Sequence, residues 1–288
     1  MPGALAHDEA CWRPGSEPSA TPFVKWAGGK RRLLNAILDA GPRRFERYLE
    51  PFVGGGAVAL AIAHPAMLLN DANVELMNAY RAAKRNPEDL MRLLDLHRVR
   101  HSAEYFYLVR AQSDEALSPL EQAARLIYLN KTCFNGLYRV NRKGQFNVPY
   151  GGRVNPTLYV GRDLLRASNA LRGAELYDGD YREFLNEHAR AGDFIYLDPP
   201  YVPVSKYSDF KRYTKEQFKA TNQHELKELF EDLLRRRCYP VLSNSWAARD
   251  LYSEHHVIEI LAARNINKDG AGRKPIPEIL VKPRVIAT

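Results

Sequence analysis

The segment DFIYLDPPYVP, residues 193–203, ends a strand-like run with a carboxylate and follows it with two prolines and an aromatic ring. Asp198 can accept a hydrogen bond from an amino group, and the carbonyl oxygen of Pro199 can accept a second from the same amine. Pro199 and Pro200 fix the local backbone, and Tyr201 offers a ring for stacking. Together they predict a site that binds a planar heterocycle with an exocyclic NH2 group and directs the lone pair of its nitrogen toward an electrophile. A proline-rich turn with a capping Asp is the purely structural alternative.

A glycine turn lies in RYLEPFVGGGAVALAIAHPAMLLND, residues 47–71, which reads as strand, turn, Ala-rich helix and second strand. At residues 54–56 the absent side chains let a ligand approach the backbone and the amides at a helix N-terminus. Asp71 ends the second strand, where a carboxylate can accept hydrogen bonds from both hydroxyls of a ribose. The pattern favours a cofactor that contains a nucleoside. A tight turn with a helix-capping Asp remains the alternative.

The third pattern is FVKWAGGK, residues 23–30, immediately before a run with helical spacing. Trp26 offers a flat face and Lys30 an ammonium group beside a flexible loop, which suits an adenine or a methionine-like zwitterion. The structural alternative is a glycine turn with a solvated lysine, because lysines are normally exposed.

Strand and helix alternate on both sides of a helical stretch from roughly Val74 to Lys131. Alternation returns after about Asp163 and continues through a long helix near residues 216–237 and three further strands. This order predicts an α/β fold with a parallel sheet and ligands at the carboxyl ends of its strands. We expect a flexible tail at 1–20, a catalytic domain formed by 21–73 and 163–288, and an inserted domain at 74–162.

The inserted part ends in CFNGLYRVNRKGQFNVPYGG, residues 133–152, which predicts a hairpin with glycine at its turn. Basic and aromatic side chains interleave here, a mixture that suits phosphate contacts combined with base readout or wedging. An ordinary solvated hairpin with an aromatic inner face is the alternative. The residues in question are Lys131, Arg139, Arg142, Lys143 and Arg153 among Phe134, Tyr138, Phe146 and Tyr150.

Composition agrees with a polyanionic partner. The 288 residues hold 42 Lys and Arg against 34 Asp and Glu, a formal charge of +8. The three cysteines show no CxxC spacing and are odd in number, which predicts neither a disulfide framework nor a metal site and favours a reducing cytoplasm. No transmembrane span and no signal peptide are expected, because the most apolar window is broken by glycines and the first 20 residues lack an apolar run.

Six motifs in order resemble the Dam-type DNA adenine methyltransferases of the α class, the D12 family, over about residues 23–283. They are FVKWAGGK, EPFVGGGAV, LND, NKTCFNGLYRVN, GQFNVP and LDPPY. The resemblance implies a Rossmann-like S-adenosylmethionine-dependent methyltransferase sheet with an inserted helical and hairpin DNA-recognition lobe. It also implies methyl transfer from S-adenosylmethionine to the exocyclic amino group of adenine in double-stranded DNA, within GATC, by base flipping and direct attack.

The same resemblance assigns roles to individual residues. Asp198 would lie close to both cofactor and target amine, and Tyr201 would stack on the flipped adenine. The cofactor pocket would be lined by Trp26, Lys30, Phe52, Gly54 and Asp71, with Asp180 and Tyr181 near the adenine of the cofactor. The candidate DNA contacts are Lys131, Asn135, Arg139, Asn141 and Arg142.

Several alternatives stay open at this point. The enzyme could methylate adenine in a different GAT-containing site. A methyltransferase for RNA or protein amides would more often carry Asn at position 198. A nicotinamide dehydrogenase would explain the glycine turn and Asp71 but would give LDPPY and KWAGGK no role. A catalytically inactive DNA-binding protein would lack one of the pocket residues. Direct attack requires neither a metal nor a cysteine nucleophile. We expect a cytoplasmic, nucleoid-associated monomer with no membrane contact and no obligatory protein partner.

Overall fold

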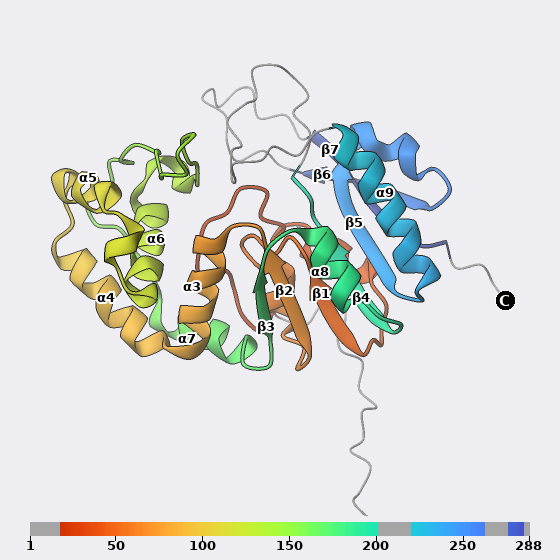
Figure 1. Cartoon of the computed structure of the whole chain (residues 1–288), viewed down its shortest axis with the longest axis horizontal. Coiled ribbons are helices and arrows are strands. Elements are labelled where there is room, and N and C mark those ends of the chain that lie inside the picture. Colours follow the sequence, from red (N-terminus) through yellow and green to blue (C-terminus); the bar gives the residue numbers. More distant parts are fainter. Residues whose placement is uncertain (1–17, 201–219, 263–275, 285–288) are drawn as a thin grey trace, which may run out of the picture.

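The computed structural model describes residues 18–200, 220–262 and 276–284. Its strands form one sheet in the order β3-β2-β1-β4-β5-β7-β6 (Figure 1). The strands are β1 (Arg47–Glu50), β2 (Met67–Asp71), β3 (Glu175–Asp178), β4 (Asp193–Leu197), β5 (Tyr239–Ser245), β6 (His256–Ala262) and β7 (Ile276–Lys282). The first five run parallel, and β7 is antiparallel to both β5 and β6. The predicted α/β class is confirmed.

Helices connect the strands and build the inserted lobe. They are α1 (Leu34–Ala40), α2 (Ala57–Ile62), α3 (Val74–Arg85), α4 (Pro87–Val99), α5 (Ala103–Ala111), α6 (Pro119–Thr132), α7 (Gly161–Ala170), α8 (Tyr181–His188) and α9 (Ala220–Arg235). Short 3₁₀ turns add η1 (Asp114–Ala116), η2 (Phe134–Gly136) and η3 (Trp246–Tyr252). Local sequence sets several boundaries; Ser118 and Glu121, for example, form a reciprocal capping box at the start of α6.

Alternate residues of each strand enter two different hydrophobic layers, as the two-residue period of a strand requires. In β4, Phe194 and Tyr196 pack with α1, α2 and α3, whereas Ile195 and Leu197 pack with α8, α9 and η3. Figure 1 shows α8 and α9 in front of the sheet. The sheet is therefore covered on both faces, which explains why its central strands are buried along most of their length.

The lobe made by α4, α5 and α6 lies beyond the β3 edge of the sheet, and α3 stands between the two (Figure 1). Helix α3 packs against α6 and α7 on one side and against β2 and β3 on the other. Buried aromatic residues of the lobe, such as Phe106 and Tyr128, belong to the same hydrophobic cluster as Tyr48 of β1. The lobe and one face of the sheet thus share a continuous core.

The predicted hairpin at 133–152 is confirmed, although its arms are irregular. The arms pair through the antiparallel bridges Cys133↔Tyr150 and Val140↔Phe146, and Gly144 takes a φ of 81° at the turn. The first arm opens with η2, where Asn135 has a φ of 55°. This left-handed turn interrupts the ladder, so neither arm extends into a regular strand.

Within residues 18–200, 220–262 and 276–284, no helix has the length and apolar character needed to cross a bilayer.

Candidate active site

The candidate site lies at the carboxyl ends of β1, β2 and β4. Strand β1 is central: the chain runs outward from it through β2 to β3 and then returns to add β4 on its other side, so the strand order reverses at β1. This is the switch point at which open parallel sheets bind ligands. Gly54 and Asp198 follow β1 and β4, and Asp71 ends β2; the topology gathers these residues at one edge although they are far apart in sequence.

Two of the sequence motifs meet in an ion pair. The Nζ atom of Lys30 lies 2.8 Å from Oδ1 of Asp198, with the two side chains 6% and 19% exposed. Lys30 also donates to the carbonyl oxygen of Gly28 at 3.0 Å. The ammonium group is therefore held against the strand-end carboxylate by its own loop, and FVKWAGGK and LDPPY form one site.

The carboxylate of Asp71 holds the glycine turn. Its Oδ2 accepts a hydrogen bond from the Gly54 amide and its Oδ1 accepts one from the Asn73 amide, both at 2.9 Å. Burial raises the pKa of Asp71 to about 6, although both amides oppose the shift. The helix cap at the start of α3 comes instead from Asn73, whose side chain accepts from the Leu76 amide.

Glycine is required in this turn for steric reasons. Gly54 has a φ of 48°, and a Cβ atom there would lie 2.9 Å from Cδ1 of Trp26. Gly56 has a φ of 68°, and its Cβ would lie 2.3 Å from the hydroxyl oxygen of Tyr80. That hydroxyl donates to the carbonyl oxygen of Gly54 at 3.0 Å. Aromatic side chains thus occupy the space that any larger residue would need.

A buried acid that sequence reasoning did not select lies beneath the turn. Oε2 of Glu50 accepts hydrogen bonds from the Tyr48 hydroxyl at 2.8 Å and from the Ala59 amide at 3.1 Å. Burial raises the pKa of Glu50 to about 8, with further contributions from Asp198 and Asp71. The sequence signal that could have identified Glu50 was its position, since it is the last residue of β1 and lies shortly before the glycine turn.

A second group of predicted cofactor residues comes together beside the turn. The rings of Phe52 and Tyr181 lie 4.7 Å apart. Asp180 caps α8 and forms a bidentate pair with Arg182, which holds the pKa of Asp180 below its usual range. Asn70, a residue missed from the sequence, donates to the Pro51 and Gly179 carbonyls and so ties the loops after β1 and β3 together.

Of the LDPPY residues, the structure describes all but Tyr201. Asp198 is half-buried, Pro199 is buried and Pro200 is exposed. Tyr201 lies outside the described residues, so its predicted stacking role stays a prediction.

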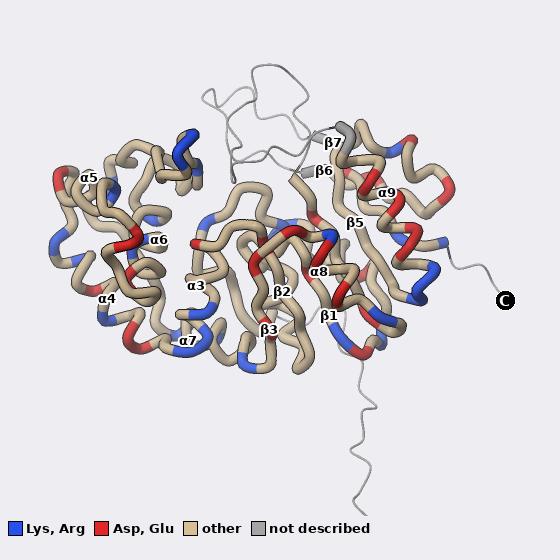
Figure 2. Tube along the Cα trace, viewed as in Figure 1, with Lys and Arg blue, Asp and Glu red and all other residues tan. Residues whose placement is uncertain are grey.

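The five candidate DNA contacts lie on α6 and the hairpin, where Figure 2 shows basic residues in blue. Asn135 and Arg142 are exposed. Arg139 is oriented by Asn147, which accepts from its Nε at 2.7 Å. Asn141 shapes the turn, because its Oδ1 accepts from the amides of Lys143 and Gln145. Lys131 is half-buried, and burial followed by repulsion from Lys25 lowers its pKa to about 8.

A family model for D12 class N6 adenine-specific DNA methyltransferases matches residues 26–266. The chain belongs to this family. It is 39% identical over 269 residues to the Type II methyltransferase M1.LlaDCHI of Lactococcus lactis subsp. cremoris, covering 90% of this chain and 94% of that relative. It is 33% identical to the DNA adenine methylase of Serratia marcescens, covering 90% and 96%, and 32% identical to that of Escherichia coli K12, covering 92% and 96%. The resemblance inferred from motifs is confirmed, and the protein is an adenine-specific DNA methyltransferase.

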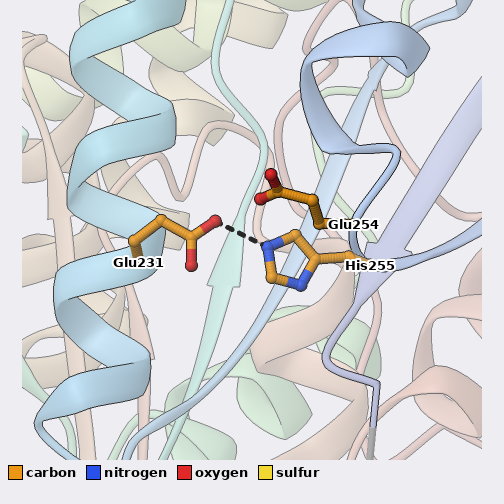
Figure 3. A group of neighbouring side chains, drawn as sticks. All are labelled: Glu231, Glu254 and His255. Carbon is orange, nitrogen blue, oxygen red and sulfur yellow. Dashed lines mark hydrogen bonds and ion pairs between the residues drawn. The ribbon is translucent and has the colours of Figure 1, made fainter.

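A group of side chains with metal-ligand chemistry lies apart from the motifs, on α9 and the turn after η3. Figure 3 shows Glu231, Glu254 and His255, whose candidate ligand atoms all lie within 4.8 Å of one another. His255 Nε2 is 2.7 Å from Glu231 Oε1. The ammonium group of Lys227 lies 3.1 Å from Glu254 and 3.8 Å from Glu231. The ammonium group of Lys227 therefore already contacts both carboxylates, and the group acts as an ion-pair network that joins α9 to the turn.

Proposed function

We propose that this enzyme uses S-adenosylmethionine to methylate the exocyclic amine of adenine in duplex DNA, within GATC. The observation that carries the proposal is the Lys30–Asp198 pair beside the glycine turn that Asp71 holds. This arrangement places Asp198, a carboxylate that can accept a hydrogen bond from an amine, near Asp71, a carboxylate that can accept from the ribose of a nucleoside. The names of the relatives, DNA adenine methylase among them, support the substrate class.

For the cofactor, the residues present fit the chemistry. Trp26 lies against the turn at Gly54 and offers a ring face, and Lys30 offers a positive charge for a carboxylate. Bound S-adenosylmethionine would supply an electrophilic methyl group on a sulfonium. We assign Trp26, Lys30, Phe52, Gly54 and Asp71 to this pocket. Asp180 and Tyr181 would lie at its adenine end, and Asp198 would border it.

The chain's own residues would act on the target base. The adenine is extruded from the duplex at a cost of a few kcal/mol, which pocket contacts recover. Asp198 and the Pro199 carbonyl would accept hydrogen bonds from the two N–H groups of the amine and so orient its lone pair. Bound S-adenosylmethionine would supply the methyl group to this nitrogen and leave as S-adenosylhomocysteine, and the surplus proton on nitrogen would pass to solvent. We propose that Pro200 rigidifies this turn and that Tyr201 stacks on the base.

Support for GATC comes from NGLYRVN and FNVP, residues 135–141 and 146–149, on the hairpin. We propose that Lys131, Asn135, Arg139, Asn141 and Arg142 form the contact surface, with base readout by some and phosphate contacts by others. We further propose that residues 74–162 form the recognition domain, and that the enzyme works as a monomer associated with the nucleoid through DNA.

The deciding experiment is methyl transfer from labelled S-adenosylmethionine to unmethylated plasmid, followed by nucleases that distinguish methylated from unmethylated GATC. We expect label in the DNA and complete GATC protection. Label without this protection would reject GATC in favour of another site containing GAT. No label in plasmid, with S-adenosylmethionine bound, would contradict the proposed reaction.

A further inference from the structure

A buried amide joins the loop before α1 to the recognition hairpin. We name residues 25–30 the tryptophan loop. Oδ1 of Asn130, near the end of α6, accepts from the Lys25 amide at 2.7 Å. Nδ2 of Asn130 donates to the Lys25 carbonyl at 2.7 Å and to the Gly136 carbonyl at 3.2 Å. Asn130 is fully buried, so these bonds fix the tryptophan loop against η2.

Aromatic contact reinforces this junction. The rings of Trp26 and Tyr138 are stacked, with centroids 5.1 Å apart and planes 27° apart. The packing beside them is close, since a Cβ atom at Gly136 would lie 2.5 Å from Cδ of Lys25. The tryptophan loop and the first arm of the hairpin therefore cannot shift independently without loss of these contacts.

The opposite end of Tyr138 reaches the start of α3. Its hydroxyl group lies close to Asn73 and Glu75: burial followed by the charge of Glu75 raises the pKa of Tyr138, and Asn73 opposes the shift. Asn73 donates its backbone amide to Asp71, whose other oxygen holds Gly54. Tyr138 is only 5% exposed. One side chain thus stacks on the tryptophan loop through its ring, and its hydroxyl end lies near the start of α3, which follows the Asp71 turn.

We propose that Tyr138 is a positioning residue that couples occupancy of the cofactor site to reading of DNA. The inference rests on the proposed function, in which Trp26 and Asp71 contact the cofactor while Asn135 and Arg139 contact DNA. Tyr138 lies between those two DNA contacts in sequence and stacks on Trp26, which in turn lies against Gly54 of the turn that Asp71 holds. A ligand that orders the tryptophan loop and the Asp71 turn also orders the hairpin, and by linkage DNA strengthens cofactor binding equally.

The test measures the affinity of S-adenosylhomocysteine by calorimetry, with and without a saturating short duplex that contains GATC. For the unaltered enzyme we expect the duplex to tighten binding by about 5-fold or more. In Tyr138→Leu, which removes both the stack and the hydroxyl, we expect the ratio of the two affinities to lie within about 2-fold of one. Tyr138→Phe keeps the stack and should retain an intermediate ratio.

Phe146→Leu provides the matched control. Phe146 packs edge-to-face on Tyr138, with centroids 5.8 Å apart. Its replacement by Leu therefore also removes aromatic packing on the hairpin, but it leaves the Tyr138 side chain in place. Retention of coupling in this variant, with loss in Tyr138→Leu, supports the proposal. Equal loss in both, or full coupling in Tyr138→Leu, overturns it.

Failure of the inference is distinguishable from failure of the proposed function. If the unaltered enzyme binds both S-adenosylhomocysteine and the duplex, but its affinity for S-adenosylhomocysteine is the same with and without the duplex, only the coupling is wrong. If it does not bind S-adenosylhomocysteine, the cofactor assignment is wrong and the coupling falls with it.

Discussion

At the scale of single residues, Asp198 combines two properties that a generic strand-end acid lacks. It is half-buried, and its partner Lys30 is held in place by the carbonyl of its own loop. A buried pair of this kind is sensitive to removal of either member, because the remaining charge loses its partner. The chemistry should therefore depend on both side chains, and on Asp198 most directly.

We predict that Asp198→Ala abolishes methyl transfer, with a loss on the order of 10²-fold or more, because the amine loses its acceptor. DNA retention should stay largely intact, since the proposed contacts lie on the hairpin. Labelled methyl transfer and a gel-shift assay measure the two effects. Asp95→Ala, which removes an exposed pair with Arg98 on α4, is the control and should leave transfer unchanged. Full activity in Asp198→Ala would refute the proposed mechanism.

Glu50 gives a prediction about pH. The folded protein holds a proton on Glu50 up to about pH 8, whereas the unfolded chain releases it near pH 4.5. The folded state therefore binds more protons in this window, and the free energy of unfolding falls as pH rises through it. Glu50→Gln cannot titrate, so we expect a smaller loss of stability between these pH values. Urea unfolding at several pH values measures the slope.

The control for this pH effect is Glu88→Gln, at an exposed position in the first turn of α4. It should keep the slope of the unaltered protein. Identical slopes for Glu50→Gln and the unaltered protein would show that Glu50 does not hold the proton.

At the scale of elements, the glycine turn illustrates what a sequence pattern can and cannot predict. The strand, turn and helix over residues 47–62 follow from local patterns, and so does the position of Asp71 at the next strand end. The partners that make the turn tight do not. Tyr80 and Trp26 approach from α3 and the tryptophan loop, and only the fold brings them to Gly56 and Gly54.

We predict that Gly56→Ala destabilises the protein more than Gly152→Ala does. Both positions have left-handed backbone, with φ values of 68° and 72°, so both substitutions carry the same conformational strain. Only the Cβ at 56 meets Tyr80, whereas nothing lies within 4 Å at 152. Overpacking should add about 1–3 kcal/mol. Urea midpoints measure the difference, and equal midpoints would contradict the steric account.

The hairpin shows the opposite limit. Its turn glycine and aromatic arms were predictable, but the irregular η2 turn was not, because Asn135 adopts a positive φ that non-glycine residues take up rarely. Likewise, Asn141 was predicted as a DNA contact, and the structure shows that its side chain already bonds two amides of the turn. Side-chain partners within a loop depend on its final shape, which local patterns do not specify.

At the scale of the whole molecule, the positive charge and the exposed hairpin should produce a salt-dependent affinity for DNA. We predict that Arg142→Ala weakens binding and reduces the slope of log affinity against log salt by about 1, as expected for one phosphate contact. Fluorescence anisotropy at several salt concentrations measures this slope. The control is Arg85→Ala, an exposed site at the end of α3 away from the hairpin. Equal slopes in the two variants would exclude Arg142 as a phosphate contact.

The sheet order was the part of the architecture that the sequence specified least. Alternating strands and helices predicted a parallel sheet, and the motif order predicted which strand ends carry the site. Nothing local predicted that β4 lies beside β1, or that Arg47 and Asp193 join them in a buried bidentate pair. Such contacts depend on tertiary packing, and this one joins the two strands at their amino ends, opposite the edge that carries the site.

That pairing of β1 with β4 also bears on how the chain folds during synthesis. Arg47 leaves the ribosome long before Asp193, its partner 146 positions later, while the lobe helices between them contact one another over shorter separations in the chain. Local contacts form faster than distant ones, so we expect the lobe to fold first and β1 to keep one unpaired edge until β4 emerges. Limited proteolysis of stalled nascent chains would follow this order. Chains truncated before residue 193 would expose that edge, which favours aggregation.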